Sequence, residues 1–104
     1  MKPSELGKHL RFFLAEYLPR QRNASAETIH AYRDALKLFL LFAANANKGS
    51  VVDLALADLN RAMVLDFLES IERERNNCAS TRNHRLAAIR SFFRCVAQST
   101  PEAV

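Results

Sequence analysis

Apolar residues recur at intervals of three and four along most of the chain, and this period is that of an amphipathic helix rather than a strand. The first such segment predicts a helix over residues 4–17, capped at its start by Ser4. The pair Leu18-Pro19 predicts its end, because proline disfavours continuation of a helix. Its inward-facing positions are Leu6, Leu10, Phe13 and Tyr17.

A second segment predicts a helix over residues 25–45, with Ser25 as its N-cap and Glu27 in the first turn, where a negative charge is favourable. Its apolar positions are Ile29, Tyr32, Ala35, Leu36, Leu38, Phe39, Leu40, Leu41, Phe42 and Ala43. Because this apolar surface is so wide, we expect the helix to lie centrally and to contact neighbours on more than one side.

The helical period is lost after residue 45. The Asn and Gly of NANKGS indicate a helix end, and VVDLALADLN predicts an irregular connection, because a single short strand would have no partner. The expected core anchors of this connection are Val52, Leu54, Leu56 and Leu59. A third helix is predicted over residues 60–75, ending in the solvated run ERER. Its inward-facing positions are Met63, Val64, Phe67, Leu68 and Ile71.

The last segment predicts a helix over residues 80–97, capped by Ser80, with Pro101 closing the ordered region. Successive residues lie about 100° apart on a helix, which separates a core face from a polar stripe. The core face consists of Leu86, Ile89, Phe93 and Val96, and the stripe of Asn83, Ala87, Arg90 and Arg94. The four helices together predict an all-α domain.

Composition agrees with one helical domain. With 104 residues, of which 49% are hydrophobic, the chain can enclose one compact core but not two. Only two glycines and three prolines are present, which favours helices over many short strands. No apolar run approaches the roughly 20 residues that span a bilayer, and no signal-like segment is evident, so we expect a cytoplasmic protein without a membrane partner.

The net charge of +4 is unevenly distributed. Lys and Arg outnumber Asp and Glu by 8 to 4 in residues 1–49 and by 4 to 1 in residues 76–104, whereas residues 50–75 carry 3 basic and 6 acidic side chains. Basic segments that flank an acidic one indicate a positive surface suited to a polyanion.

The start of the fourth predicted helix carries Arg82 and Arg85, although helix stability alone favours Asp or Glu in the first turns. Free backbone N–H groups at a helix N-terminus already attract anions, and these arginines add to that attraction. Together with Ser80, Thr81 and Asn83, they are candidate contacts to phosphate or to base edges. Arg90 and Arg94 fit a solvated basic face equally well.

No constellation in the sequence indicates a metal, a cofactor or catalysis. The cysteines lack CxxC spacing and are interpreted as reduced thiols, and the histidines fall on different predicted helices. Two aspartates of the connection are interpreted as turn and cap residues, and a glycine-rich phosphate loop is missing. The cysteines are Cys78 and Cys95, the histidines are His9, His30 and His84, and the two aspartates are Asp53 and Asp58. We expect no cofactor.

Three stretches follow one another along the chain and carry a resemblance to a known family: SAETIHAYRDALKLFLLFA, DLNRAMVLDFLESI and STRNHRLAAIRSFFRCV. Together they resemble the N-terminal core-binding domain of the tyrosine recombinases, the phage-integrase and Xer-like site-specific recombinases. The resemblance extends from about residue 6 to residue 96. It implies a four-helix, SAM-like orthogonal bundle that forms one half of a clamp around double-stranded DNA, with the second and fourth helices against the major groove.

The resemblance also implies which residues contact DNA. On the second helix they are Ser25, Thr28 and Arg33, and on the fourth they are Ser80, Thr81, Arg82, Asn83, Arg85 and Arg90, to which the basic stripe adds Arg94. Tyr32 matches a family tyrosine, but its place in the apolar stripe favours a packing role with the hydroxyl at the rim.

In this family a tyrosine nucleophile in a separate C-terminal domain performs strand transfer. By that resemblance, residues 1–98 would be the DNA-binding domain and residues 99–104 the start of a linker to a catalytic domain that these residues do not include. Tyr17 and Tyr32 lack the surrounding cations that such a nucleophile needs, so we expect no catalysis here. The parent recombinase is expected to be tetrameric on paired sites and the isolated domain monomeric.

The alternative interpretation is a helical protein-interaction module that does not bind DNA, because similar bundles also serve that purpose. Such a module predicts an apolar or charge-complementary patch that stays exposed, whereas a DNA clamp predicts aligned cations. The acidic third helix is a candidate for a second, protein-binding face.

Overall fold

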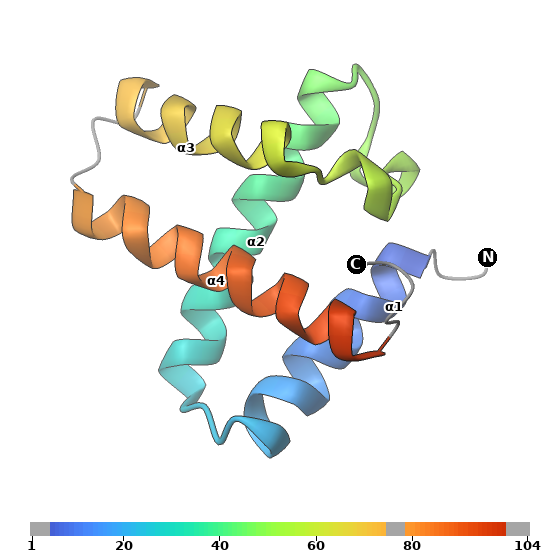
Figure 1. Ribbon diagram of the computed structural model, residues 1–104, viewed down its shortest axis with the longest axis vertical. Helices are drawn as coiled ribbons and strands as arrows, with labels where there is room; N and C mark the ends of the chain where they lie inside the picture. Colours follow the sequence, from blue (N-terminus) through green and yellow to red (C-terminus); the bar gives the residue numbers. More distant parts are fainter. Residues whose placement is uncertain (1–4, 75–78, 100–104) are drawn as a thin grey trace.

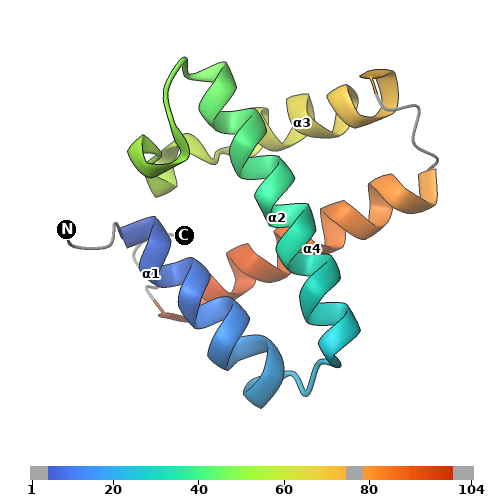
Figure 2. The ribbon, with the colours of Figure 1, turned by 180° about the vertical axis from the view of Figure 1, so that it is seen from behind.

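The computed structural model describes residues 5–74 and 79–99. Four α-helices follow one another in these ranges, and no strand is found in them: α1 (Glu5–Phe12), α2 (Ala26–Ala46), α3 (Arg61–Glu74) and α4 (Ala79–Ser99). Helix α2 crosses behind α4 in Figure 1 and in front of it in Figure 2, and it packs against α3, α4 and the helical segment that follows α1. The all-α fold and the central place of α2 are confirmed.

The first helix is longer than the sequence predicts. Helix α1 continues without a break into the π-helix η1 (Phe13–Gln21), so the predicted end at Leu18-Pro19 is wrong. Proline has no N–H and crowds the carbonyl four residues earlier in an α-helix. The wider π pattern, with the Arg22 N–H donating to the Tyr17 carbonyl at 3.0 Å, accommodates Pro19. The proposed cap Ser4 lies outside the described residues.

Helix α2 begins where the sequence predicts. The Ser25 hydroxyl oxygen accepts a hydrogen bond from the Thr28 backbone N–H at 3.1 Å, and the same hydroxyl donates to the Thr28 Oγ1 at 3.0 Å. The helix ends at Ala46 with Asn47 as its C-cap, after which Lys48 adopts a left-handed φ of 56° and the Gly49 N–H donates to the Ala44 carbonyl. The capping role predicted for Ser25 is confirmed.

Replacing Ser25 with alanine is expected to lower the free energy of unfolding by about 1 kcal/mol, because one N–H of the first turn loses its acceptor. Chemical denaturation followed by circular dichroism measures this change. Ser25→Asp keeps an acceptor and should retain most of the stability. Equal losses for both variants would show that the cap contributes nothing.

The connection between α2 and α3 forms two 3₁₀ turns, η2 (Val51–Asp53) and η3 (Leu56–Asp58). The Asp53 carboxylate accepts from the Ser50 hydroxyl at 2.9 Å, and the Asp58 carboxylate accepts from the Ala55 N–H at 2.8 Å. Their interpretation as turn and cap residues is therefore confirmed.

Three of the four predicted anchors of this connection reach the core. Leu54 and Leu59 are buried and Leu56 is half-buried, but Val52 is 76% exposed, because the first 3₁₀ turn directs it away from the helices. Helix α3 then begins after Asn60, whose side-chain oxygen accepts from the Met63 N–H at 2.9 Å. Its predicted end at Arg75 lies outside the described residues.

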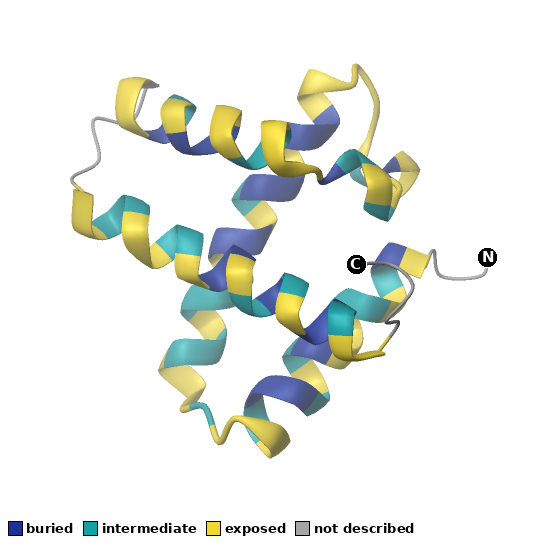
Figure 3. Ribbon diagram, in the orientation of Figure 1, coloured by how far each residue is buried: buried dark blue, intermediate teal, exposed yellow. Residues whose placement is uncertain are grey.

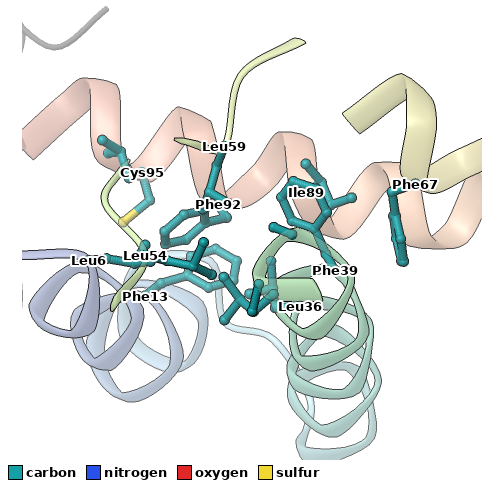
Figure 4. Close-up of a cluster of buried hydrophobic side chains, with 14 of the residues drawn as sticks. Leu6, Phe13, Leu36, Phe39, Leu54, Leu59, Phe67, Ile89, Phe92 and Cys95 are labelled. Atoms are coloured by element: carbon teal, nitrogen blue, oxygen red, sulfur yellow. The ribbon is translucent and has the colours of Figure 1, made fainter. Parts of the chain in front are cut away.

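The core collects aromatic rings from four segments (Figure 4). Phe13 of η1 meets Phe92 of α4 edge-on, with ring centroids 5.5 Å apart, and Phe39 of α2 meets Phe67 of α3 at 5.3 Å. Figure 3 shows the buried positions along the sides on which the helices face one another. Contacts between helices far apart in the sequence therefore hold the bundle together.

The buried face of α4 is rotated relative to the sequence prediction. Ile89 and Val96 are buried as expected, but Leu86 and Phe93 are only half-buried. The side chains actually enclosed are Ala88, Ile89, Phe92, Cys95 and Val96. The reason is the position of η1, which packs against α4 on the side of Phe92.

Candidate nucleic-acid interface

Helix α4 presents an outward stripe that is separate from the core, as predicted. Asn83, Ala87, Arg90 and Arg94 are all exposed. Arg90 and Arg94 lie one helical turn apart, and neither has an ion-pair partner in residues 5–74 or 79–99. Two adjacent guanidinium groups that are not neutralised within the described chain can attract an anionic surface.

The N-terminal half of α4 and the N-terminal half of α2 enclose a shallow hollow. It is lined by Ala31, Asp34, Ala35, Ser80, Thr81, His84 and Arg85. The Nη1 atom of Arg85 is shielded from solvent there and has no hydrogen-bond partner among the described residues. The hollow thus combines two hydroxyl groups with the cationic Arg85 side chain, whose Nη1 atom is unsatisfied but closed to solvent, and Asp34 adds one negative charge to its wall.

Arg82 lines a different concavity from Arg85. It lines a groove between α3 and α4, together with Arg61 and Arg90 at the rim and Leu86 and Phe93 in the apolar part. Its Nε atom is 2.8 Å from the Glu72 Oε1 of α3. The structure therefore separates Arg82 from Arg85, although both lie in the first turns of the same helix.

The predicted contacts on α2 do not gather beside those of α4. Ser25 and Thr28 are occupied with each other at the N-cap. Arg33 lines a groove on the α1 side of α2, next to Leu10 and Leu14, rather than the hollow that holds Arg85. Among the ten candidate residues, the hollow brings together Ser80, Thr81 and Arg85, and the outward stripe brings together Asn83, Arg90 and Arg94.

One capping prediction at this site is wrong. Ser80 is not the N-cap of α4, because Ala79 before it is already helical. Its hydroxyl instead lines the hollow with Thr81. Cys78 precedes Ala79 and lies outside the described residues.

Sequence reasoning missed three polar residues that shape this surface: Asp34, His84 and Glu72. Asp34 and His84 line the hollow, and the His84 ring meets the Tyr32 ring edge-on with centroids 5.8 Å apart. Glu72 was interpreted only as part of a solvated run, and it is indeed exposed, but it pairs with Arg82. Only the contact between two helices reveals that role.

The tyrosines and the buried cysteine serve packing. Tyr32 is half-buried and stacks on Phe13 with ring centroids 6.5 Å apart, while Tyr17 is buried beside the same ring at 5.7 Å. Burial raises the pKa of the Cys95 thiol, which keeps it protonated and a poor nucleophile at neutral pH.

The described residues offer no other recognisable chemical site. Residues 5–74 and 79–99 contain no group of three or more His, Cys, Asp or Glu side chains placed to hold a metal ion. Within the same ranges, no helix has the length and apolar character required to cross a membrane.

Comparison with known proteins connects this chain to a family. Residues 12–99 match the family described as phage integrase, N-terminal SAM-like domain. The integrase/recombinase y4rD of Sinorhizobium fredii (strain NBRC 101917 / NGR234) is 46% identical over 92 residues, which is 88% of this chain and 33% of the relative. The integrase/recombinase y4rC of the same strain is 34% identical over 101 residues, which is 97% of this chain and 30% of the relative. The chain thus spans about a third of the length of these relatives, and no solved structure matches it.

Proposed function

Because the chain belongs to the phage integrase N-terminal SAM-like domain family, we propose that it is the DNA-binding domain of a site-specific tyrosine recombinase. In this proposal the domain holds double-stranded DNA as one half of a clamp, and a separate domain of a longer protein cleaves and rejoins the strands. Both curated relatives carry the name integrase/recombinase and are about three times as long as the matched segment, which supports this division of labour.

The observation that carries the proposal is the outward stripe of α4. Arg90 and Arg94 are exposed and without an acidic partner in the described ranges, which suits phosphate contact along a duplex. Arg82 and Arg85 flank the same helix near its N-terminus, where the helix dipole also favours anions. Helix α4 is therefore the principal DNA-contacting element, and exposed Asn83 is its candidate for reading a base edge.

Helix α2 has a smaller part in this proposal. Its N-terminal turn carries the hydroxyl groups of Ser25 and Thr28, which can contact a sugar-phosphate backbone while keeping the cap. Arg33 lies on the α1 side, so it contacts DNA only where a bent or wrapped duplex reaches that flank. The parent recombinase would act as a tetramer on paired sites, with the isolated domain monomeric.

A second candidate function is protein interaction, and the groove between α1 and α2 favours it. That groove is lined mainly by leucines, among them Leu41, which is 49% exposed. Arg33 and Lys37 stand at its edge. This groove lies apart from the stripe of α4, and Arg33 is the DNA-contact candidate that lines it.

Removing the Arg82 or Arg85 side chain separately (Arg82→Ala, Arg85→Ala) is expected to weaken DNA binding and to lower the slope of log K against log salt by about one unit for each lost phosphate contact. Fluorescence anisotropy of a labelled short duplex, titrated at several salt concentrations, measures both quantities. Arg20→Ala is the matched control, because Arg20 is exposed on η1 and paired with Glu16. If both α4 variants bind like the parent, the assignment of α4 is wrong.

Amide spectra of the nitrogen-15-labelled domain, recorded during titration with the same duplex, locate the contact by residue. Salt-sensitive shifts concentrated on residues 25–33 and 80–94 would support the clamp. Amides that stay unchanged with DNA but shift with protein concentration would favour the interaction module instead.

A further inference from the structure

We propose that Glu72 competes with DNA for Arg82: its carboxylate holds the Arg82 guanidinium in the free protein, and a backbone phosphate takes its place on binding. The two residues belong to different helices, α3 and α4, and Glu72 Oε1 lies 2.8 Å from Arg82 Nε. This inference rests on the proposed DNA-binding function, because it assigns a role to one of its arginines.

The geometry of the Arg82–Glu72 ion pair favours replacement of the carboxylate by a phosphate. Although Nε lies so close to Oε1, its N–H does not point at that oxygen, and Nε has no hydrogen-bond partner among the described residues. The attraction is therefore a contact between charges without the directed bond that strengthens arginine–carboxylate pairs. The Nε atom itself is closed to solvent, so a phosphate would meet the guanidinium at the part of the Arg82 side chain that stays exposed.

The exposure of the pair gives a phosphate access. The Arg82 side chain is 33% exposed and the Glu72 side chain 52% exposed, so the ion pair forms at the surface, where water and salt weaken it. Arg82 also lines the groove between α3 and α4 with Arg90 at the same rim. In this proposal a duplex that lies along the α4 stripe passes this groove, and a phosphate takes the place of the carboxylate at the exposed part of the Arg82 side chain.

The α3 helix provides a matched control for the loss of one negative charge. Glu69 lies one turn before Glu72, is exposed, and pairs with Arg73 of the same helix at 3.3 Å. Glu69→Gln and Glu72→Gln change the net charge equally, but only Glu72→Gln releases an arginine of α4. A gain in DNA affinity that comes from net charge alone appears in both variants, whereas a gain from the release of Arg82 appears only in Glu72→Gln.

The test compares dissociation constants for a labelled duplex at low salt. Glu72→Gln is expected to bind about two- to fivefold more tightly than Glu69→Gln, the range for breaking an exposed ion pair. In the Arg82→Ala background this difference is expected to vanish, because the arginine that Glu72 holds is gone. Circular dichroism melting of each variant confirms that all of them are folded.

The outcomes separate this inference from the proposed function. If the parent binds DNA and Arg82→Ala weakens binding, but Glu72→Gln binds no more tightly than Glu69→Gln, Glu72 is a structural link between α3 and α4 and the competition is refuted. Weaker binding by Glu72→Gln would also refute it and would assign Glu72 to orienting Arg82. Absence of DNA binding by the parent would overturn the proposed function and this inference together.

Discussion

Replacing Phe92 with alanine is expected to lower the free energy of unfolding by about 3–5 kcal/mol. Phe92 is 1% exposed and its ring meets that of Phe13 edge-on at 5.5 Å, so the shortened side chain would leave a cavity between α4 and η1. Packed neighbours fill such a cavity only partly, which adds to the loss of apolar burial. Urea denaturation followed by circular dichroism measures the change.

Phe93 is the matched control for this experiment. It is the next residue on the same helix and has the same side chain, but it is half-buried and lines the surface grooves on either side of Leu59 and Asn60. Phe93→Ala should cost about 1–2 kcal/mol, because part of the ring already contacts water. If Phe93→Ala proved the more destabilising of the two, the orientation of α4 in the core would be wrong.

Reversing both charges of the outward stripe (Arg90→Glu with Arg94→Glu) is expected to weaken DNA binding about 100-fold at low salt. Each reversal removes a charge-assisted phosphate contact and adds a repulsion, which is worth about tenfold or more per position. Both side chains are exposed, so the melting temperature should stay close to that of the parent. Anisotropy titrations with a labelled duplex and circular dichroism melting test the two expectations.

The control is a second double variant that changes the net charge by the same amount at positions outside α4. Lys8 is exposed on α1 and Lys48 is exposed just after α2, and neither belongs to α4. Lys8→Glu with Lys48→Glu should reduce binding only through the long-range field of the protein, which salt screens. Equal losses in both double variants would mean that net charge alone attracts DNA and that the stripe is not its contact surface.

Local sequence signals predicted the helices well where the signal and the structural feature lie within a few residues of each other. The Ser25 cap, the Asp53 turn and the Asp58 turn all depend on hydrogen bonds between residues three positions apart. The end of the first helix was predicted wrongly because a local signal was overridden by packing against distant residues. The proline signal at Pro19 is local, but the π-helix that accommodates it buries Tyr17 and Leu18 against the other helices.

The candidate site shows the same limit more clearly. The period of α4 separated Arg90 and Arg94 from the core correctly, because that separation follows from helical geometry alone. It did not reveal that Arg82 and Arg85 line different concavities, nor that Arg33 lies on the α1 side of α2. Those positions depend on the crossing of α2 and α4 and on the place of α3.

The sequence by itself determined the all-α class, the four helices, the Ser25 cap, the Asp53 and Asp58 turns and the basic stripe of α4, because helical period and local hydrogen bonding depend on residues three or four positions apart. Only the tertiary structure decided which phenylalanine of the pair Phe92 and Phe93 is enclosed, and that Glu72 meets Arg82. Both depend on how helices pack against one another. That packing is set by the shapes of surfaces distant in the sequence, which no local pattern records.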